Sequence, residues 1–306
     1  MSILIEAKNL GRWYGEVVGL GDLTVDIEPG ITGLLGPNGA GKSTFMKLMV
    51  GELKPSRGSI TVLGHRPFAS LELYSQLGFC PQQDALYDHM TGAGFVEHLL
   101  RLAGFDRKDA RARARRSMER VHLEESMDRR CGGYSKGMRQ RTRLAQAIAH
   151  DPKLLVVDEP LTGLDPIARH QTLELFRELA EGGTSMIVSS HVLHEVQSLT
   201  DSIVMIHRGR LLAQGTVGDV RRLLAKHPRQ VRISAREPRR LAEALMSMDH
   251  VRSIRLSDDG SLVTETRDVD GLFGALPALA DRLQAGVQSL DSSDDDLEAV
   301  FDYLVG

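Results

Sequence analysis

The run GPNGAGKST at residues 36–44 constrains the fold of this chain more than any other segment. The apolar stretch ITGLLG leads into it, and the segment KSTFMKLMVGEL that follows spaces Phe45, Met46, Leu48 and Met49 for one buried helix face. A strand, a glycine-rich loop and the start of a helix together form a nest of backbone N–H groups that binds phosphate oxygens. The sequence therefore predicts a βα unit that holds the phosphates of a nucleotide.

Each residue type of this loop has a chemical task. The glycines let the backbone wrap closely around phosphates, Lys42 places a cation beside the β- and γ-phosphates, and Ser43 offers its hydroxyl to Mg²⁺. We expect the whole loop to contact the nucleotide, through Gly36, Pro37, Asn38, Gly39, Ala40, Gly41, Lys42, Ser43 and Thr44. Loops of this kind serve kinases, GTPases, helicases and transporters, so the loop alone does not fix the function.

A second motif, LLVVDEP at residues 154–160, narrows the chemistry. Its bare apolar run is typical of a strand buried in a parallel sheet. Asp158, at the end of that run, can bind Mg²⁺ through water, and the adjacent Glu159 can orient or polarise an attacking water. Alone, the motif also fits a capped strand end before a proline turn. Together with the phosphate loop it predicts hydrolysis of the nucleotide.

Composition and charge exclude several classes of protein. The 306 residues suit one large and one smaller domain, and 42% apolar with 26% charged residues is typical of a soluble globular protein. Lys and Arg number 38 against 41 Asp and Glu, so we expect no nucleic-acid partner. Cys80 and Cys131 lack the spacing of a zinc site or disulfide framework, which fits a reducing cytoplasm. No stretch approaches the about 18 apolar residues of a membrane span, so a membrane function would need a partner that supplies the spans.

The order of expected elements predicts an α/β fold for residues 1–225. Two short strands, at 3–10 and 23–27, open the chain, separated by the glycine-rich segment 11–21. Strands and helices then alternate, which favours a parallel α/β core with a helical subdomain at about 84–140. The run from Arg129 to Arg143 holds six cations and no acid, and for most of them we expect a solvated helix face.

A second domain is predicted for residues 226–306, where the composition shifts at Lys226-His227-Pro228. This part holds 10 Lys and Arg against 15 Asp and Glu, whereas residues 1–225 hold 28 against 26. The change of sign argues against a basic arm for nucleic acid. Its pattern is βαββαβα, which predicts a small α+β domain of ferredoxin-like arrangement that ends in a helix.

The segment YSKGMRQR at 134–141, just upstream of the LLVVDEP strand, resembles the signature loop of the ABC ATPase family. The commonest form of that loop is LSGGQ, so Ser135 and Gly137 match, while Tyr134, Lys136 and Met138 depart. Ser135 can cap the following helix and leave N–H groups for an anion, although a plain helix N-cap is the alternative. The resemblance implies a dimer of this chain with a second copy or a paralogous ATPase, because the family places this loop against the γ-phosphate held by the other subunit.

Four single residues resemble further positions of the family, and the resemblance covers about residues 3–225. Tyr14 in RWYG would stack on adenine, and Gln82 in CPQQ would bind Mg²⁺ and couple the site to a partner. Asp165 in TGLDP would lie at the nucleotide site, and His191 in SSHV would contact the γ-phosphate during catalysis. Each of these residues alone is more often structural, but their joint order and spacing favour the family.

The resemblance implies a P-loop NTPase of the ABC type, with a RecA-like core and an N-terminal antiparallel β part. It further implies ATP and Mg²⁺ as ligands, a separate transmembrane permease subunit as partner, and a place on the cytoplasmic face of the cell membrane. The ending DDDLEAVFDYLVG, residues 294–306, resembles the tail of ATPase subunits of bacterial ABC exporters, which implies export. An acidic helix N-terminus on a small capping or dimerising domain is the alternative for this tail.

Two other functions remain open at this point. A soluble ABC ATPase could act on DNA, ribosomes or cluster assembly, but the span from Lys42 to Asp158 has no long heptads, and the chain holds one ATPase unit rather than a tandem pair. A regulatory subunit that binds ATP without turnover would fit the altered signature loop, but the intact Lys42, Glu159 and His191 argue against it. The sequence does not identify the cargo.

Overall fold

The computed structural model describes residues 3–83, 85–219, 229–257 and 259–292. The chain divides into two compact units, Met1–Thr216 and Val217–Gly306. The boundary expected at residues 225 and 226 lies in the stretch 220–228, outside the described residues. Among the described residues, no helix combines the length and the apolar character needed to cross a membrane.

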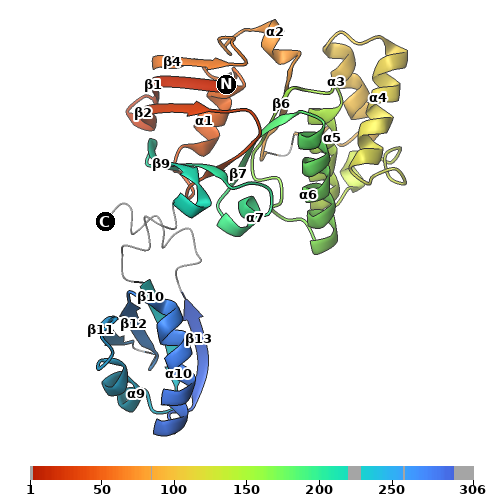
Figure 1. Cartoon of the computed structure of the whole chain (residues 1–306). Coiled ribbons are helices and arrows are strands. Elements are labelled where there is room, and N and C mark those ends of the chain that lie inside the picture. Colours follow the sequence, from red (N-terminus) through yellow and green to blue (C-terminus); the bar gives the residue numbers. More distant parts are fainter. Residues whose placement is uncertain (1–2, 84, 220–228, 258, 293–306) are drawn as a thin grey trace. The chain divides into compact units, whose positions relative to one another are not determined.

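A six-stranded sheet forms the centre of the first unit (Figure 1). Its strands are parallel except the last, which runs antiparallel to its neighbour. The order across the sheet is β5 (Leu77–Cys80), β6 (Leu154–Val157), β7 (Ser185–Ser190), β3 (Ile31–Leu35), β8 (Ser202–His207) and β9 (Arg210–Thr216). β6 and β7 are buried along their whole length, as their apolar runs predicted.

An antiparallel sheet of β2 (Val17–Ile27), β1 (Ile5–Tyr14) and β4 (Arg57–Val62) forms the N-terminal part. The prediction of two short strands separated by residues 11–21 is wrong, because β1 and β2 continue through most of that segment to a turn at Gly15. Three register irregularities between Ala7 and Trp13 interrupt the pairing of β1 with β2. Bulges of this kind accommodate glycine-rich sequence inside a strand, so the glycines do not end the hairpin.

The helices of the first unit pack on its sheets or on one another. They are α1 (Lys42–Met49), α2 (Leu71–Tyr74), α3 (Gly92–Leu102), α4 (Arg107–Arg120), α5 (Lys136–Ile148), α6 (Pro166–Glu181) and α7 (Leu193–Gln197), with a 3₁₀ turn at Cys131–Gly133. Alternate residues of β6 serve two cores: Leu154 and Val156 pack with α1 and the antiparallel sheet, whereas Leu155 and Val157 pack with α3 to α6. This two-sided burial fixes the end of β6, where the predicted catalytic carboxylates follow.

The second unit has the predicted ferredoxin-like arrangement. Its elements are β10 (Arg229–Ala235), α9 (Pro238–Leu245), β11 (Val251–Leu256), β12 (Leu262–Thr266), α10 (Val269–Leu283) and β13 (Val287–Ser292). The strands are all antiparallel in the order β11-β12-β10-β13. A separate core holds the unit together, with Val231, Ile233, Leu241 and Leu272 fully buried. The expected last helix falls in residues 293–306, outside the described residues.

Candidate functional site

The loop between β3 and α1 has the backbone that phosphate binding requires. Gly39 and Gly41 have φ values of 78° and 107°, in the region that favours glycine. A Cβ on Gly41 would lie 2.7 Å from the carbonyl oxygen of Gly19, and a Cβ on Gly36 would lie 2.4 Å from that of Ile206. The loop is therefore packed so closely against neighbouring backbone that side chains at Gly36 and Gly41 are excluded.

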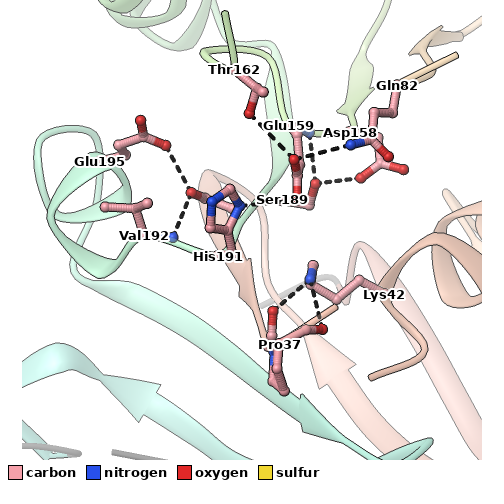
Figure 2. A network of polar contacts seen from close by, with 12 residues as sticks. Pro37, Lys42, Gln82, Asp158, Glu159, Thr162, Ser189, His191, Val192 and Glu195 are labelled. Carbon is pink, nitrogen blue, oxygen red and sulfur yellow. Dashed lines mark hydrogen bonds and ion pairs between the residues drawn. The ribbon is translucent and has the colours of Figure 1, made fainter. Parts of the chain in front are cut away.

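Lys42 is the first residue of α1 and only 6% exposed. Its Nζ donates hydrogen bonds to the carbonyl oxygens of Gly36, at 2.5 Å, and Pro37, at 3.1 Å, so the ammonium lies inside the curve of the loop (Figure 2). Burial lowers the pKa of Lys42, and the nearby charges of Glu159 and Asp158 oppose that shift. The loop thus holds a desolvated cation where phosphate oxygens would gain most from it.

Asp158 follows β6 and receives hydrogen bonds from two serines. Ser43 Oγ donates to Oδ2 at 2.9 Å and Ser189 Oγ donates to Oδ1 at 2.6 Å. The structure therefore joins the hydroxyl and the carboxylate that the sequence predicted as metal ligands. Such hard oxygen donors suit Mg²⁺, which takes one or two protein ligands and completes its shell with water and phosphate oxygens.

Glu159 lies at the centre of the polar network in Figure 2. Gln82 Nε2 donates to its Oε2 at 3.1 Å, Thr162 Oγ1 donates to the same oxygen at 3.3 Å, and His191 Nδ1 lies 3.1 Å from Oε1. The carboxylate is buried, whereas the His191 side chain is 46% exposed. Glu159 also has a positive φ of 49°, a conformation that costs energy for a residue with a side chain and that is found preferentially at functional sites.

The other predicted site residues lie outside this network. Ser135 is exposed and caps α5 by accepting a hydrogen bond from Met138 N at 3.2 Å, and Gly137 follows in the first turn. Asp165 caps α6, and hydrogen bonds from Ala168 N and Ile167 N lower its pKa. Among the hydrogen bonds of the described residues, none joins Ser135, Gly137 or Asp165 to Lys42 or Glu159.

Tyr14, predicted to stack on adenine, lies near the end of β1 with 43% of its surface exposed. The guanidinium of Arg12 lies 5.2 Å from the centre of its ring. A Cβ on Gly19 would be 2.7 Å from the ring, so the absence of a side chain there makes room for the tyrosine. The ring of Tyr14 is therefore positioned by Arg12 and Gly19. Its stacking on adenine stays a prediction.

Sequence reasoning missed Ser189, whose hydroxyl joins the carboxylate of Asp158 to the backbone of Glu159. Besides donating to Asp158, its Oγ accepts a hydrogen bond from Glu159 N at 2.8 Å. β6 and β7 pair in parallel with Val157 opposite Val188, which brings Ser189 beside Asp158. The signal was the polar SSH that ends an apolar strand, because the ends of neighbouring parallel strands meet at one edge of the sheet.

We expect Ser189→Ala to lower ATP turnover by about tenfold, because the buried Glu159 N–H loses its acceptor and Asp158 loses a donor. The measurement is steady-state ATP hydrolysis at saturating MgATP. Ser185→Ala is the matched control: it removes a hydroxyl from the same strand that accepts a hydrogen bond from Gly30 N, away from the carboxylates. Equal turnover of both variants and the wild type would contradict a role for Ser189.

Comparison with known proteins agrees with this geometry. A family model described as ABC transporter matches residues 20–162. The chain is 32% identical over 305 residues to the daunorubicin/doxorubicin resistance ATP-binding protein DrrA of Streptomyces peucetius, covering 99% of this chain and 92% of that one. It is 30% identical over 309 residues to the bacitracin transport ATP-binding protein BcrA of Enterococcus faecalis, covering 100% and 97%.

Solved structures give the same result. The structure of an ATP binding subunit of an ABC transporter matches with a TM-score of 0.66 and 31% identity, over 72% of this chain and 93% of that one. The dimeric cassette MJ0796 matches with a TM-score of 0.65 at 23% identity, which supports the fold. With nearly full-length similarity to two ATP-binding proteins and the phosphate loop and carboxylates in place, the chain belongs to the ABC transporter family, as an ATP-binding, ATP-hydrolysing subunit.

Proposed function

We propose that this chain drives export through a separate transmembrane permease subunit, using MgATP held at residues 36–44. The observation that carries the proposal is the network in which Lys42, Asp158 and Glu159 lie between the ends of β3, β6 and β7. The named activities of similar proteins support export: the relatives include a drug-resistance protein and the Nod factor export ATP-binding protein I of Burkholderia orbicola, which is 35% identical over 213 residues.

In the proposed mechanism, the glycine loop binds the phosphates through its backbone N–H groups, and Lys42 compensates their charge. Ser43, Asp158 and Gln82 would hold Mg²⁺, which when bound neutralises charge on the β- and γ-phosphates. Glu159 orients the attacking water and accepts its hydrogen bond. His191, which lies 3.1 Å from Glu159 and is partly exposed, supplies a polar contact to the γ-phosphate.

The active unit in this proposal is a dimer with a second copy or a paralogous ATPase. Ser135 is the exposed N-cap of α5 and Gly137 lies in its first turn, where backbone N–H groups can face the γ-phosphate held by the partner. Asp165 would border the same interface, and Tyr14 would stack on the adenine held by its own chain. Closure of two such subunits around ATP, and reopening after hydrolysis, would supply the motion that the permease uses.

The proposed location is the cytoplasmic face of the cell membrane, reached through the permease. No nucleic-acid partner is proposed, because the net charge is near −3 and the second unit is acidic. The cargo would be recognised by the permease, so the residues of this chain do not select it.

The experiment that tests this function is a purification of the tagged Glu159→Gln chain with ATP from detergent-solubilised membranes, followed by mass spectrometry. We expect a protein with several membrane spans to copurify in stoichiometric amount. The control is the Lys42→Met chain, which is expected to bind ATP weakly and therefore not to be held in the ATP-bound state. Recovery only from the soluble fraction, together with ribosomes, DNA or assembly factors, would replace the export proposal by a soluble ABC ATPase.

A further inference from the structure

Arg143, on α5, is a buried arginine that donates to one stretch of backbone. It is 7% exposed, and its Nη1 lies within hydrogen-bond distance of three consecutive carbonyl oxygens: Pro81 at 2.8 Å, Gln82 at 2.7 Å and Gln83 at 2.5 Å. The expectation of a solvated helix face for the run Arg129–Arg143 does not hold for this residue. A backbone that turns three successive carbonyls toward one cation is ordered by that cation.

The clamped segment carries a residue of the catalytic network. Residues 81–83 follow β5, and from them the side chain of Gln82 donates to Glu159 Oε2 at 3.1 Å. The segment has no strand or helix pairing of its own to fix its conformation. Arg143 on α5 therefore binds the backbone carbonyls of this segment, while the side chain of Gln82 donates to Glu159.

Through Gln140, the same arginine is also linked to the backbone that follows Glu159. Arg143 Nη2 donates to Gln140 Oε1, and Gln140 Nε2 donates to the carbonyl oxygen of Pro160 at 3.3 Å. Pro160 directly follows Glu159 in the chain. Helix α5 thus contacts the segment that delivers Gln82 and the segment that delivers Glu159, and Arg143 takes part in both contacts.

A lysine at position 143 could not make the same set of hydrogen bonds. A guanidinium presents its donors in a fixed planar fork, so one group can reach the three carbonyls and Gln140 together, whereas an ammonium is a point charge on a flexible stem. Arg141, two residues earlier, shows the contrast: its Nη1 donates to the carbonyl oxygens of Val121 and His122, at 3.3 and 3.0 Å, away from the catalytic network.

The geometry points to Arg143 as a positioning residue for ATP hydrolysis, which holds segment 81–83 so that the amide of Gln82 stays against Glu159. This inference rests on the proposed role of Glu159 and goes beyond it, because it makes turnover depend on a side chain of α5 that donates to backbone carbonyls and to Gln140. A merely structural arginine would affect stability and ATP affinity but would not act through Gln82.

The test is a double-mutant cycle in the full-length chain, with Arg143→Met, Gln82→Ala and the double variant. We expect Arg143→Met to lower kcat by about 10-fold to 100-fold with the Kd for ATP within about twofold of wild type. In the double variant, turnover should be no lower than in Gln82→Ala alone, because the positioned amide is already absent. Arg143→Lys should fall between wild type and Arg143→Met.

Arg115→Met is the control, because Arg115 on α4 donates to the exposed carboxylate of Asp128 and not to the catalytic segments, and its turnover should stay within about twofold of wild type. The inference is overturned if Arg143→Met keeps wild-type kcat, or if its loss multiplies with that of Gln82→Ala. If Arg143→Met does not fold, Arg143→Lys carries the same cycle. Failure of the proposed role of Glu159 would look different, because Glu159→Gln would then keep wild-type turnover, and failure of the export proposal would appear only in the copurification experiment.

Discussion

Replacing Glu159 by Gln is expected to lower the turnover number for ATP by about 100-fold to 1,000-fold, a loss typical of a removed general base. The change keeps the size of the side chain but removes the charge and half of its acceptor capacity. Gln82, Thr162 and His191 all lie within hydrogen-bond distance of the two carboxylate oxygens, so the amide would also have to reorganise these contacts. Turnover is measured as phosphate release at saturating MgATP.

ATP affinity should change by less than about threefold in the same variant, because the phosphate loop and Lys42 are untouched. The comparison of kcat with Kd separates a role in the reaction from a role in binding. Glu178→Gln, at an exposed position of α6, is the isosteric control and should behave as wild type. Wild-type turnover in Glu159→Gln would transfer the catalytic role to another residue and contradict the proposed mechanism.

The parts of the site that the sequence predicted are those carried by contiguous residues. The strand, loop and helix around Lys42 are adjacent in the chain, and local backbone geometry alone makes the phosphate nest. Asp158 and Glu159 directly follow an apolar run whose burial on both faces marks a central strand. The carboxyl ends of parallel strands lie at one edge of a sheet. The phosphate loop and the two carboxylates each follow such a strand, so they are expected to lie close together.

What the sequence did not predict depends on contacts between distant residues. Ser189 reaches Asp158 through the register of β7 against β6, and Arg143 reaches residues 81–83 across about 60 positions of the chain. A serine in a strand and an arginine in a basic helical run look like many others. Only the three-dimensional pairing shows that one hydroxyl and one guanidinium are buried against the catalytic segment.

The N-terminal hairpin shows a second reason why the sequence alone did not predict the whole fold. Glycine and its spacing predicted a break at residues 11–21, since glycine is depleted in regular strands. In the folded chain, pairing on both sides of β1, with β2 and with β4, holds the strand through its irregularities. The tertiary pairing outweighs the local preference, and it places the ring of Tyr14 beside Gly19.

Lys42→Met should weaken ATP binding by about 100-fold, the second large effect expected for this site. Removing a charge-assisted contact to phosphate costs about 3 kcal/mol, and each 1.4 kcal/mol is about tenfold in Kd. Solvent screens this contact little, because Lys42 is 6% exposed. The measurement is a calorimetric or fluorescence titration with MgATP.

Lys47→Met provides the control on the same helix, because Lys47 pairs with Glu52 at 3.1 Å on the surface, where an ion pair contributes little. Its Kd should match wild type. In Lys42→Met the folded state should be preserved, since the lost ammonium donates to two carbonyl oxygens at the expense of its own hydration. Tight ATP binding by a folded Lys42→Met chain would mean that the backbone N–H groups of the loop, and not the buried cation, supply the affinity for phosphate.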